Sequence, residues 1–340
     1  MISRQGKRTI VLENKPSIIG HSSAVGKTEG EGPLKNEFDT VFTDDTINNC
    51  ESWEKSESAL QKEAVTNAIK KAKLTPRDID LIMAGDLLNQ CIGTSFGIRD
   101  LEIPFMGMYG ACSTMALSMA TASILVSCGA LKHAIAATSS HFASAERQFR
   151  LPLEYGGQRP PEAQRTATAA GATVIAENKK NMPCIEKVIF GKIMDLGIKD
   201  ANNMGAAMAP AAADTIAQYL KDTNTDPNDL DLILTGDLGK VGTDLLLELL
   251  VKDYNYDISK VHSDCGLLLY DREAQDVHAG ASGCGCSGAV VNSYIMRKIK
   301  SKELNRVLFV GTGALLSPTS TLQGESIPSI AHGILLTSGE

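Results

Sequence analysis

The sequence of 340 residues has few aromatic side chains and no excess of basic ones. Aromatic residues make up 5% of the chain, and 40 acidic residues outnumber 33 lysines and arginines, giving a net charge of −7. Nucleic-acid-binding surfaces combine clustered basic charge with aromatic rings for base stacking, and neither stands out here. We therefore expect no nucleic-acid partner.

The sequence also lacks a long unbroken apolar run. The longest mostly apolar stretch, residues 115–137, is interrupted by serines, a glycine, Lys132 and His133, which is typical of buried globular structure. The segment after Met1 carries charges and no apolar core. We therefore expect a soluble chain of cytoplasmic type, in which the eight cysteines stay reduced.

An internal repeat is the strongest pattern present. PRDIDLIMAGDL at 76–87 aligns without gaps with PNDLDLILTGDL at 227–238. Each copy predicts a turn followed by a short buried strand. Asp86 and Asp237 occupy equivalent places after the strands, which predicts a shared turn or helix-capping role.

A second, looser correspondence supports a duplication. Residues 110–140 and 283–313 each run from a Gly/Cys turn through a helix to an apolar strand. Strands separated by helices pair in parallel with right-handed crossovers. We predict an α/β fold with two similar halves, residues 1–180 and 181–340, related by a pseudo-twofold axis.

The segment GHSSAVGKTEGEG, which begins at Gly20, is similar to a phosphate-binding loop but has the wrong spacing. Five residues separate Gly20 from Gly26 where the motif has four. Gly30, Gly32 and Pro33 disfavour the helix that should follow. We predict a loop here and no nucleotide site.

A second irregular segment, residues 146–165, contains three prolines and two glycines. These residues disfavour regular structure, and a loop of this length in a compact fold is usually functional or part of an oligomer contact. It carries Arg147, Arg150, Arg159 and Arg165.

Cys112 lies in the stretch MYGACSTMALSMA, at the start of a predicted helix of small residues that ends near Gly129. The helix N-terminus can stabilise a thiolate, and its N–H groups can receive an anion. The alternative is an inert buried cysteine.

The duplicated chain with Cys112 in this place resembles the thiolase and ketoacyl synthase superfamily. The resemblance implies a layered αβαβα fold, a homodimer, and a nucleophilic cysteine assisted by two groups from the second half. One partner position holds Asp237 instead of His or Asn, and in HAGASG the residue His278 lies one place out of register. A thiolase fold without its acid/base pair is therefore predicted. The alternative is an acyl-CoA thiolase or ketoacyl synthase-type acyltransferase that uses Cys112.

A narrower resemblance covers essentially the whole chain. Seven segments look like the stage V sporulation protein AD family: IPFMGMYGACSTM, ATSSHFASAERQFRLPLEYGGQRPPEAQ, MGAAMAPAAADTI, DLILTGDLGKVG, DCGLLLYD, SGCGCSGAVV and GTGALLSP. This resemblance implies binding of dipicolinic acid, with or without calcium, for its uptake into the forespore during sporulation. It also implies a role in the release of dipicolinic acid in germination. It also implies a place peripheral to the spore inner membrane, contact with other proteins of the dipicolinate channel system, and no cofactor.

Dipicolinate is a planar pyridine with two carboxylates, which a helix N-terminus and arginines can bind. The candidate ligand-binding residues are Cys112, His141, Arg147, Arg150, Asp237 and His278. For each arginine, the alternative is a surface or dimer-interface ion pair.

The segment GCGCSG raises a further alternative, a zinc site. Cys284 and Cys286 form a Cys-x-Cys pattern, to which Cys265 and His278 could add ligands. A tight glycine-rich turn before a helix explains the pattern better, so no metal site is expected.

Overall fold

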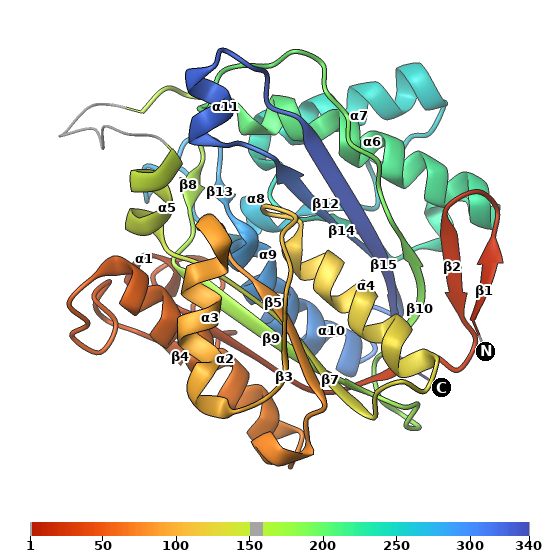
Figure 1. Ribbon diagram of the computed structural model, residues 1–340. Coiled ribbons are helices and arrows are strands. Elements are labelled where there is room, and N and C mark those ends of the chain that lie inside the picture. The colour runs from red at the N-terminus through yellow and green to blue at the C-terminus, as the bar shows by residue number, and fades with distance from the viewer. Residues whose placement is uncertain (1, 150–158, 340) are drawn as a thin grey trace.

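The computed structural model describes residues 2–149 and 159–339, and Arg150 lies outside these ranges. Most strands join one mixed sheet, whose two ends fold around a central layer of helices (Figure 1). No helix in the described ranges is long and apolar enough to cross a membrane.

In the first half of the chain, five strands of this sheet follow one another in the order β6–β5–β7–β9–β3. Their bounds are β3 (Ser17–Val25), β5 (Leu81–Gly85), β6 (Phe105–Gly107), β7 (His133–Ser140) and β9 (Ala169–Ala176). Strand β5 is parallel to β6 and β7, whereas β9 is antiparallel to β7 and β3. This order places β6 at an edge of the sheet.

The second half repeats this arrangement in the order β12–β11–β14–β15–β10. The bounds are β10 (Cys184–Ile189), β11 (Leu232–Thr235), β12 (His262–Asp264), β14 (Arg306–Ala314) and β15 (Ser329–Thr337). Again the first two pairs in the order are parallel and the last two antiparallel. The repeated sequence segments become equivalent turns, η1 (Pro76–Asp78) and η4 (Pro227–Asp229), each leading into β5 or β11. The predicted duplication is therefore present in the structure.

Helices cover the outer faces and fill the centre. In the first half, α2 (Trp53–Lys71) and α3 (Ile92–Ile98) lie outside the sheet, as α6 (Met204–Thr223) and α7 (Gly239–Tyr254) do in the second (Figure 1). The inner helix α4 (Thr114–Ser127) packs on β5 and β7 of its own half and on β14 and β15 of the other. Beside it, α9 (Cys284–Val290) continues through the π-helical turn η5 (Val291–Ile295) into α10 (Met296–Lys300).

The remaining elements are short. They are β1 (Ile2–Gln5), β2 (Thr9–Leu12), α1 (Lys27–Gly30), β4 (Thr40–Val41), η2 (Asn89–Cys91), η3 (Arg99–Leu101), α5 (Phe142–Phe149), β8 (Arg165–Thr166), α8 (Cys265–Leu269), β13 (Ala281–Ser282) and α11 (Pro318–Leu322). Strand β8 pairs with β13 in parallel and so connects the two halves beside α5.

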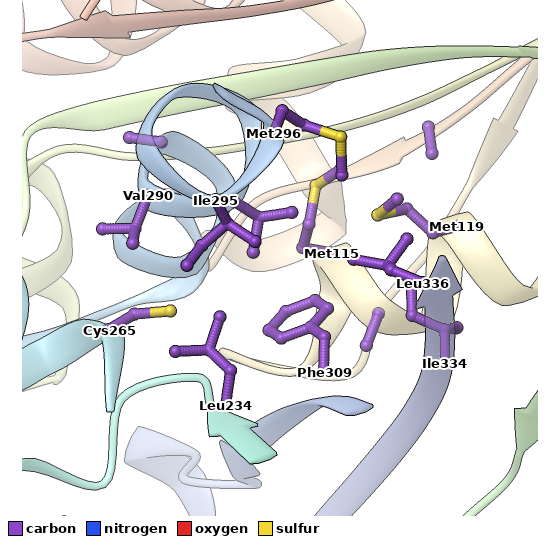
Figure 2. Close-up of a cluster of buried hydrophobic side chains, with 14 of the residues drawn as sticks. Met115, Met119, Leu234, Cys265, Val290, Ile295, Met296, Phe309, Ile334 and Leu336 are labelled. Atoms are coloured by element: carbon purple, nitrogen blue, oxygen red, sulfur yellow. The ribbon is translucent and has the colours of Figure 1, made fainter. Parts of the chain in front are cut away.

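The central layer is closed by flexible apolar side chains. Met115 and Met119 of α4 meet Met296 of α10, and Phe309 of β14 and Leu336 of β15 complete the cluster (Figure 2). Unbranched methionines fill irregular gaps between elements that meet at different angles. This core fixes the position of α4 and therefore of the turn before it.

The prediction of a loop at residues 20–32 is wrong. Residues 17–25 form the buried strand β3, and α1 follows directly. Small residues are needed in this strand because α2 crosses it closely: a Cβ on Gly20 would lie 2.4 Å from the carbonyl oxygen of Ala68. Glycine and serine here allow close packing and do not mark a turn.

The segment predicted to be irregular, residues 146–165, is partly regular where the structure describes it. Helix α5 includes Glu146 to Phe149, and Arg165 opens β8. The three prolines of the segment come later in the sequence than the described part of α5, and Pro152 lies outside the described residues.

Candidate ligand-binding site

Cys112 lies in a tight turn immediately before α4. Ala111 adopts a left-handed backbone conformation with φ of 50°, which is uncommon for a residue with a side chain. The turn is closed by Ser113, whose hydroxyl donates to the carbonyl oxygen of Gly110 at 2.6 Å, and by Thr114, whose hydroxyl donates to Ala111 O at 2.6 Å. The thiol is thereby fixed at the end of a pocket, with the residue only 4% exposed.

The pocket combines elements of both halves and has a cavity volume of about 30 Å³. Its walls are mostly apolar, and its polar groups lie around the thiol and on α5 and β8. The lining residues are Leu87, Tyr109, Ala111, Cys112, Ala145, Glu146, Phe149, Thr166, Met204, Ser282, Ala314 and Leu316. None of these described lining residues is a histidine, lysine or arginine.

Asp237 is the acid that faces the thiol, and its carboxylate is already in use. It accepts hydrogen bonds from the Gly283 N–H at 2.8 Å, the Ser282 hydroxyl at 3.2 Å and the Thr312 hydroxyl at 2.8 Å. The Cys112 thiol is a further hydrogen-bonding partner. A carboxylate has about four lone-pair positions, so these partners leave little capacity to accept a proton from a substrate.

The pKa of the Cys112 thiol is raised well above its ordinary value, first by burial and then by the Asp237 carboxylate. Burial also raises the pKa of Asp237. Desolvation and the neighbouring acid therefore oppose the thiolate that a helix N-terminus can stabilise. The structure favours the alternative interpretation of Cys112 as a buried thiol.

The repeat-equivalent acids Asp86 and Asp237 have different roles. Asp86 accepts from the N–H groups of Leu88 and Thr94, at 2.8 and 2.7 Å, and caps α3 within its own half. The comparable cap of α7 is supplied by Asp264, which accepts from Leu238 and Gly239. Asp264 therefore takes the place of Asp237 as the cap of α7, and the Asp237 carboxylate is directed toward α9 and Cys112. The shared capping role predicted from the repeat applies to Asp86 alone.

His141 lies outside the pocket lining. One ring nitrogen, Nε2, is 2.8 Å from the carbonyl oxygen of Asp45, and the other accepts from the N–H of Ala143 at 3.2 Å. The ring is also close to Trp53, with centroids 5.4 Å apart. Burial lowers the pKa of His141, so the ring is neutral at physiological pH.

The structure does not bring Arg147 or His278 to the pocket lining either. Arg147 forms an ion pair with Glu54 on the protein surface. His278 lies in a turn, where Nε2 is 3.1 Å from Asp276 Oδ1. Of the six predicted ligand residues, Cys112 lines the pocket, Asp237 supports it from behind, and Arg150 lies outside the described residues. Their ligand contacts stay predictions.

The cysteines of the glycine-rich turn are packed into the core. Cys284 Sγ donates to the carbonyl oxygen of Ser139 at 3.0 Å, and both Cys284 and Cys286 are fully buried. Within residues 2–149 and 159–339, no group of three or more His, Cys, Asp or Glu side chains is arranged to hold a metal ion.

Sequence reasoning missed the polar wall formed by Glu146, Thr166 and the neighbouring Arg159. The Thr166 hydroxyl donates to Glu146 Oε1 at 3.2 Å, and Arg159 Nη2 lies 3.6 Å from Glu146 Oε2. The missed signal is helical spacing, since Ala145, Glu146 and Phe149 share one face of α5 and all line the pocket. Because residues 146–165 were predicted to be irregular, this helical spacing was not recognised.

The sequence pattern of the stage V sporulation protein AD family matches residues 6–337. Stage V sporulation protein AD of Bacillus subtilis (strain 168) is 49% identical over 330 residues, covering 97% of this chain and 96% of that protein. The chain belongs to the stage V sporulation protein AD family.

Solved structures with low sequence identity share the fold of this stage V sporulation protein AD family member. The 3-oxoacyl-[acyl-carrier-protein] synthase III from Aquifex aeolicus VF5 aligns with a TM-score of 0.57 at 13% identity, covering 95% of this chain and 99% of that one. Acetamide-bound OleA from Xanthomonas campestris aligns with a TM-score of 0.55 at 14% identity, covering 94% of this chain and 98% of that one. The predicted thiolase-like α/β fold is confirmed.

Proposed function

We propose that this stage V sporulation protein AD family member binds dipicolinic acid without acyl transfer and serves its uptake into the forespore and its release in germination. The observation that carries the non-catalytic part is the Cys112–Asp237 contact. A nucleophilic thiol needs a base that removes its proton. Here the neighbouring acid raises the pKa of the thiol and is occupied by Ser282, Gly283 and Thr312.

The pocket suits a small planar ligand with polar ends. Phe149 and Tyr109 supply aromatic surface, and apolar side chains such as Leu87 and Leu316 line the remainder. Hydroxyl groups of Thr166 and Ser282 provide polar contacts. An apolar pocket with a few convergent polar groups is the usual form of a small-molecule site. These features, together with family membership, support dipicolinate as the ligand.

Calorimetry on the purified chain tests the ligand. Dipicolinate should give saturable heat with one site per chain, measured both with and without calcium. Pyridine-2-carboxylate is the matched control, because it keeps the ring and loses one carboxylate, and it should bind more weakly. The absence of saturable heat with dipicolinate under both conditions would contradict the proposal.

Acyl transfer is tested by intact-mass measurement after incubation with acyl-CoA. The raised pKa of Cys112 predicts no stable adduct. An acyl adduct that is absent from the Cys112→Ala variant would favour the acyltransferase alternative. Unfolding the adduct-free protein and alkylating it with iodoacetamide confirms that the thiol was present and free.

We also infer a homodimer that works peripheral to the spore inner membrane with other proteins of the dipicolinate system. Family membership supports the location and the partners. The dimer has a structural candidate, an exposed apolar patch around the edge strand β6. The patch consists of Ile92, Phe96, Phe105, Met106 and Tyr109, all at least 39% exposed.

A further inference from the structure

An ion pair beside the pocket could supply a cation for a carboxylate ligand. Glu146 is 3% exposed and lines the pocket, and Arg159 Nη2 lies 3.6 Å from its Oε2. We propose that Arg159 is the anchor for a ligand carboxylate and that Glu146 competes with the ligand for this anchor. This inference rests on the proposed function, since it names the residue that selects an anionic ligand at the same site.

Two contacts of Glu146 are of the kind that a bound carboxylate would make. Its Oε1 accepts from the Thr166 hydroxyl at 3.2 Å, and its Oε2 is 3.6 Å from Arg159 Nη2. The second distance is longer than that of a direct charge-assisted hydrogen bond. A ligand carboxylate at hydrogen-bonding distance from Nη2 would therefore have a shorter contact with Arg159 than Glu146 has.

Arg159 is oriented for this role by contacts that do not use its whole guanidinium. Nη1 donates to the carbonyl oxygen of Gln164 at 3.0 Å, and the guanidinium carbon lies 5.0 Å from the centre of the Phe142 ring. Its side chain keeps 27% exposure. Nη2 faces the pocket wall while the backbone and the ring hold the rest, an arrangement that preorganises the donor.

The acidic side chain among the described lining residues favours such an exchange. Glu146 is the one acidic side chain among the described lining residues, and none of those residues is basic. A dicarboxylate that entered without displacing Glu146 would place like charges together in a poorly solvated site. Movement of Glu146 away from Arg159 removes the repulsion and exposes a cation at the same time.

A binding series on the full chain tests the exchange. The variants are Glu146→Gln, Arg159→Gln, Arg159→Lys, the double variant Glu146→Gln/Arg159→Gln, and Arg297→Gln. The last is the matched control, because it removes an arginine from an ion pair with Glu37 that lies outside the pocket lining. The ligands are dipicolinate and isophthalate, which has the same carboxylate geometry without the ring nitrogen.

Glu146→Gln should bind about tenfold more tightly because the competitor is gone, and Arg159→Gln should bind at least about tenfold more weakly. Arg159→Lys should fall between Arg159→Gln and the unsubstituted chain, and Arg297→Gln should stay within about twofold. In the Arg159→Gln background, the gain from Glu146→Gln should disappear, since there is no anchor left to release. Thermal midpoints measured in parallel confirm that each variant is folded.

Several outcomes overturn the proposal. If Arg159→Gln binds as tightly as Arg297→Gln, Arg159 is not the anchor. Weaker binding by Glu146→Gln, together with a calcium requirement in the unsubstituted chain, would mean that Glu146 holds a metal ion brought by the ligand. If isophthalate binds with the predicted variant pattern and dipicolinate does not bind, the anchor stands and the proposed function fails. If neither ligand binds, both fail.

Discussion

Buried carboxyl groups dominate the chemistry at the scale of single residues. Glu57 of α2 and Asp86 after β5 are both buried, and a Cβ on Gly93 would lie 3.2 Å from one carboxyl carbon and 3.3 Å from the other. Burial raises the pKa of both groups, and the charge of Asp86 further raises the pKa of Glu57. Two carboxyl groups in one dry site retain a proton between them at pH values where exposed acids are ionised.

The retained proton predicts a pH-dependent stability. An acid with a raised pKa in the folded state stabilises fully below its unfolded pKa, and this contribution is lost as the pH rises through the folded pKa. Because the pKa of Glu57 is raised, its contribution to the free energy of unfolding should fall from about pH 4 upward. Urea unfolding at about pH 5, 7 and 9 should show a smaller decline in the free energy of unfolding for Glu57→Gln. This variant keeps the shape of the side chain but has no ionisable group. Glu63→Gln, on the same helix outside the pair, should keep the original slope; an unchanged slope in Glu57→Gln would contradict the prediction.

Residue positions could be predicted from sequence only where local chemistry determined them. Cys112 was identified because Gly-Ala-Cys precedes a helix, and Asp237 because the repeat placed it after a strand. Their contact was not predictable, since it depends on how the two halves face each other. Glu146 and Arg159 were missed for the same reason: the pocket wall forms only when α5 is placed against β8.

At the scale of elements, close contact between backbones determines which residues are tolerated. Strand β9 passes directly under α9: a Cβ on Gly171 would lie 2.0 Å from the carbonyl oxygen of Gly288. Backbone atoms cannot move aside as a side chain can. The two glycines therefore set the distance between the sheet of the first half and the central helix of the second.

Gly171→Ala should accordingly destabilise the protein by about 3 kcal/mol or more, as overpacking against a backbone does. The free energy of unfolding in urea measures the effect. Gly107→Ala on β6 is the matched control, since its Cβ would come no closer than 3.6 Å to the Phe105 ring. Equal stability of the two variants would show that α9 can shift away from the sheet.

The elements themselves were predictable where periodicity was regular. The duplicated turn and strand follow from the short apolar run after each Pro/Asp turn, and the helix after Cys112 from its small apolar run ending at Gly129. Strand β3 was not predictable, because its glycine and serines are imposed by α2 on its outer face. Local propensity favours a turn for these residues, and tertiary packing overrides it.

At the scale of the whole molecule, the two sheet edges differ. All three residues of β6 are exposed, whereas the equivalent edge strand β12 is half-buried or buried. An exposed apolar edge strand offers unpaired backbone groups together with apolar surface. This asymmetry favours pairing of β6 with a second copy.

The dimer prediction can be checked by light scattering after size-exclusion chromatography. The chain of 36.2 kDa should elute as a dimer, and Met106→Lys should shift the population to monomer because a charge on an edge strand opposes pairing. Val251→Lys, also at an exposed apolar position but on α7, should leave the dimer intact. A monomeric unsubstituted chain, or a dimer unaffected by Met106→Lys, would contradict the proposal.

The pocket is assembled from both halves, and this has a consequence for folding. Cys112 meets Asp237 and Ser282, and β8 pairs with β13, so each wall depends on segments far apart in the chain. Contacts of high sequence separation form late, because long loops must close first. A ligand that binds here recognises only the completely folded chain and stabilises it by mass action. Ligand occupancy would therefore also report that folding is complete.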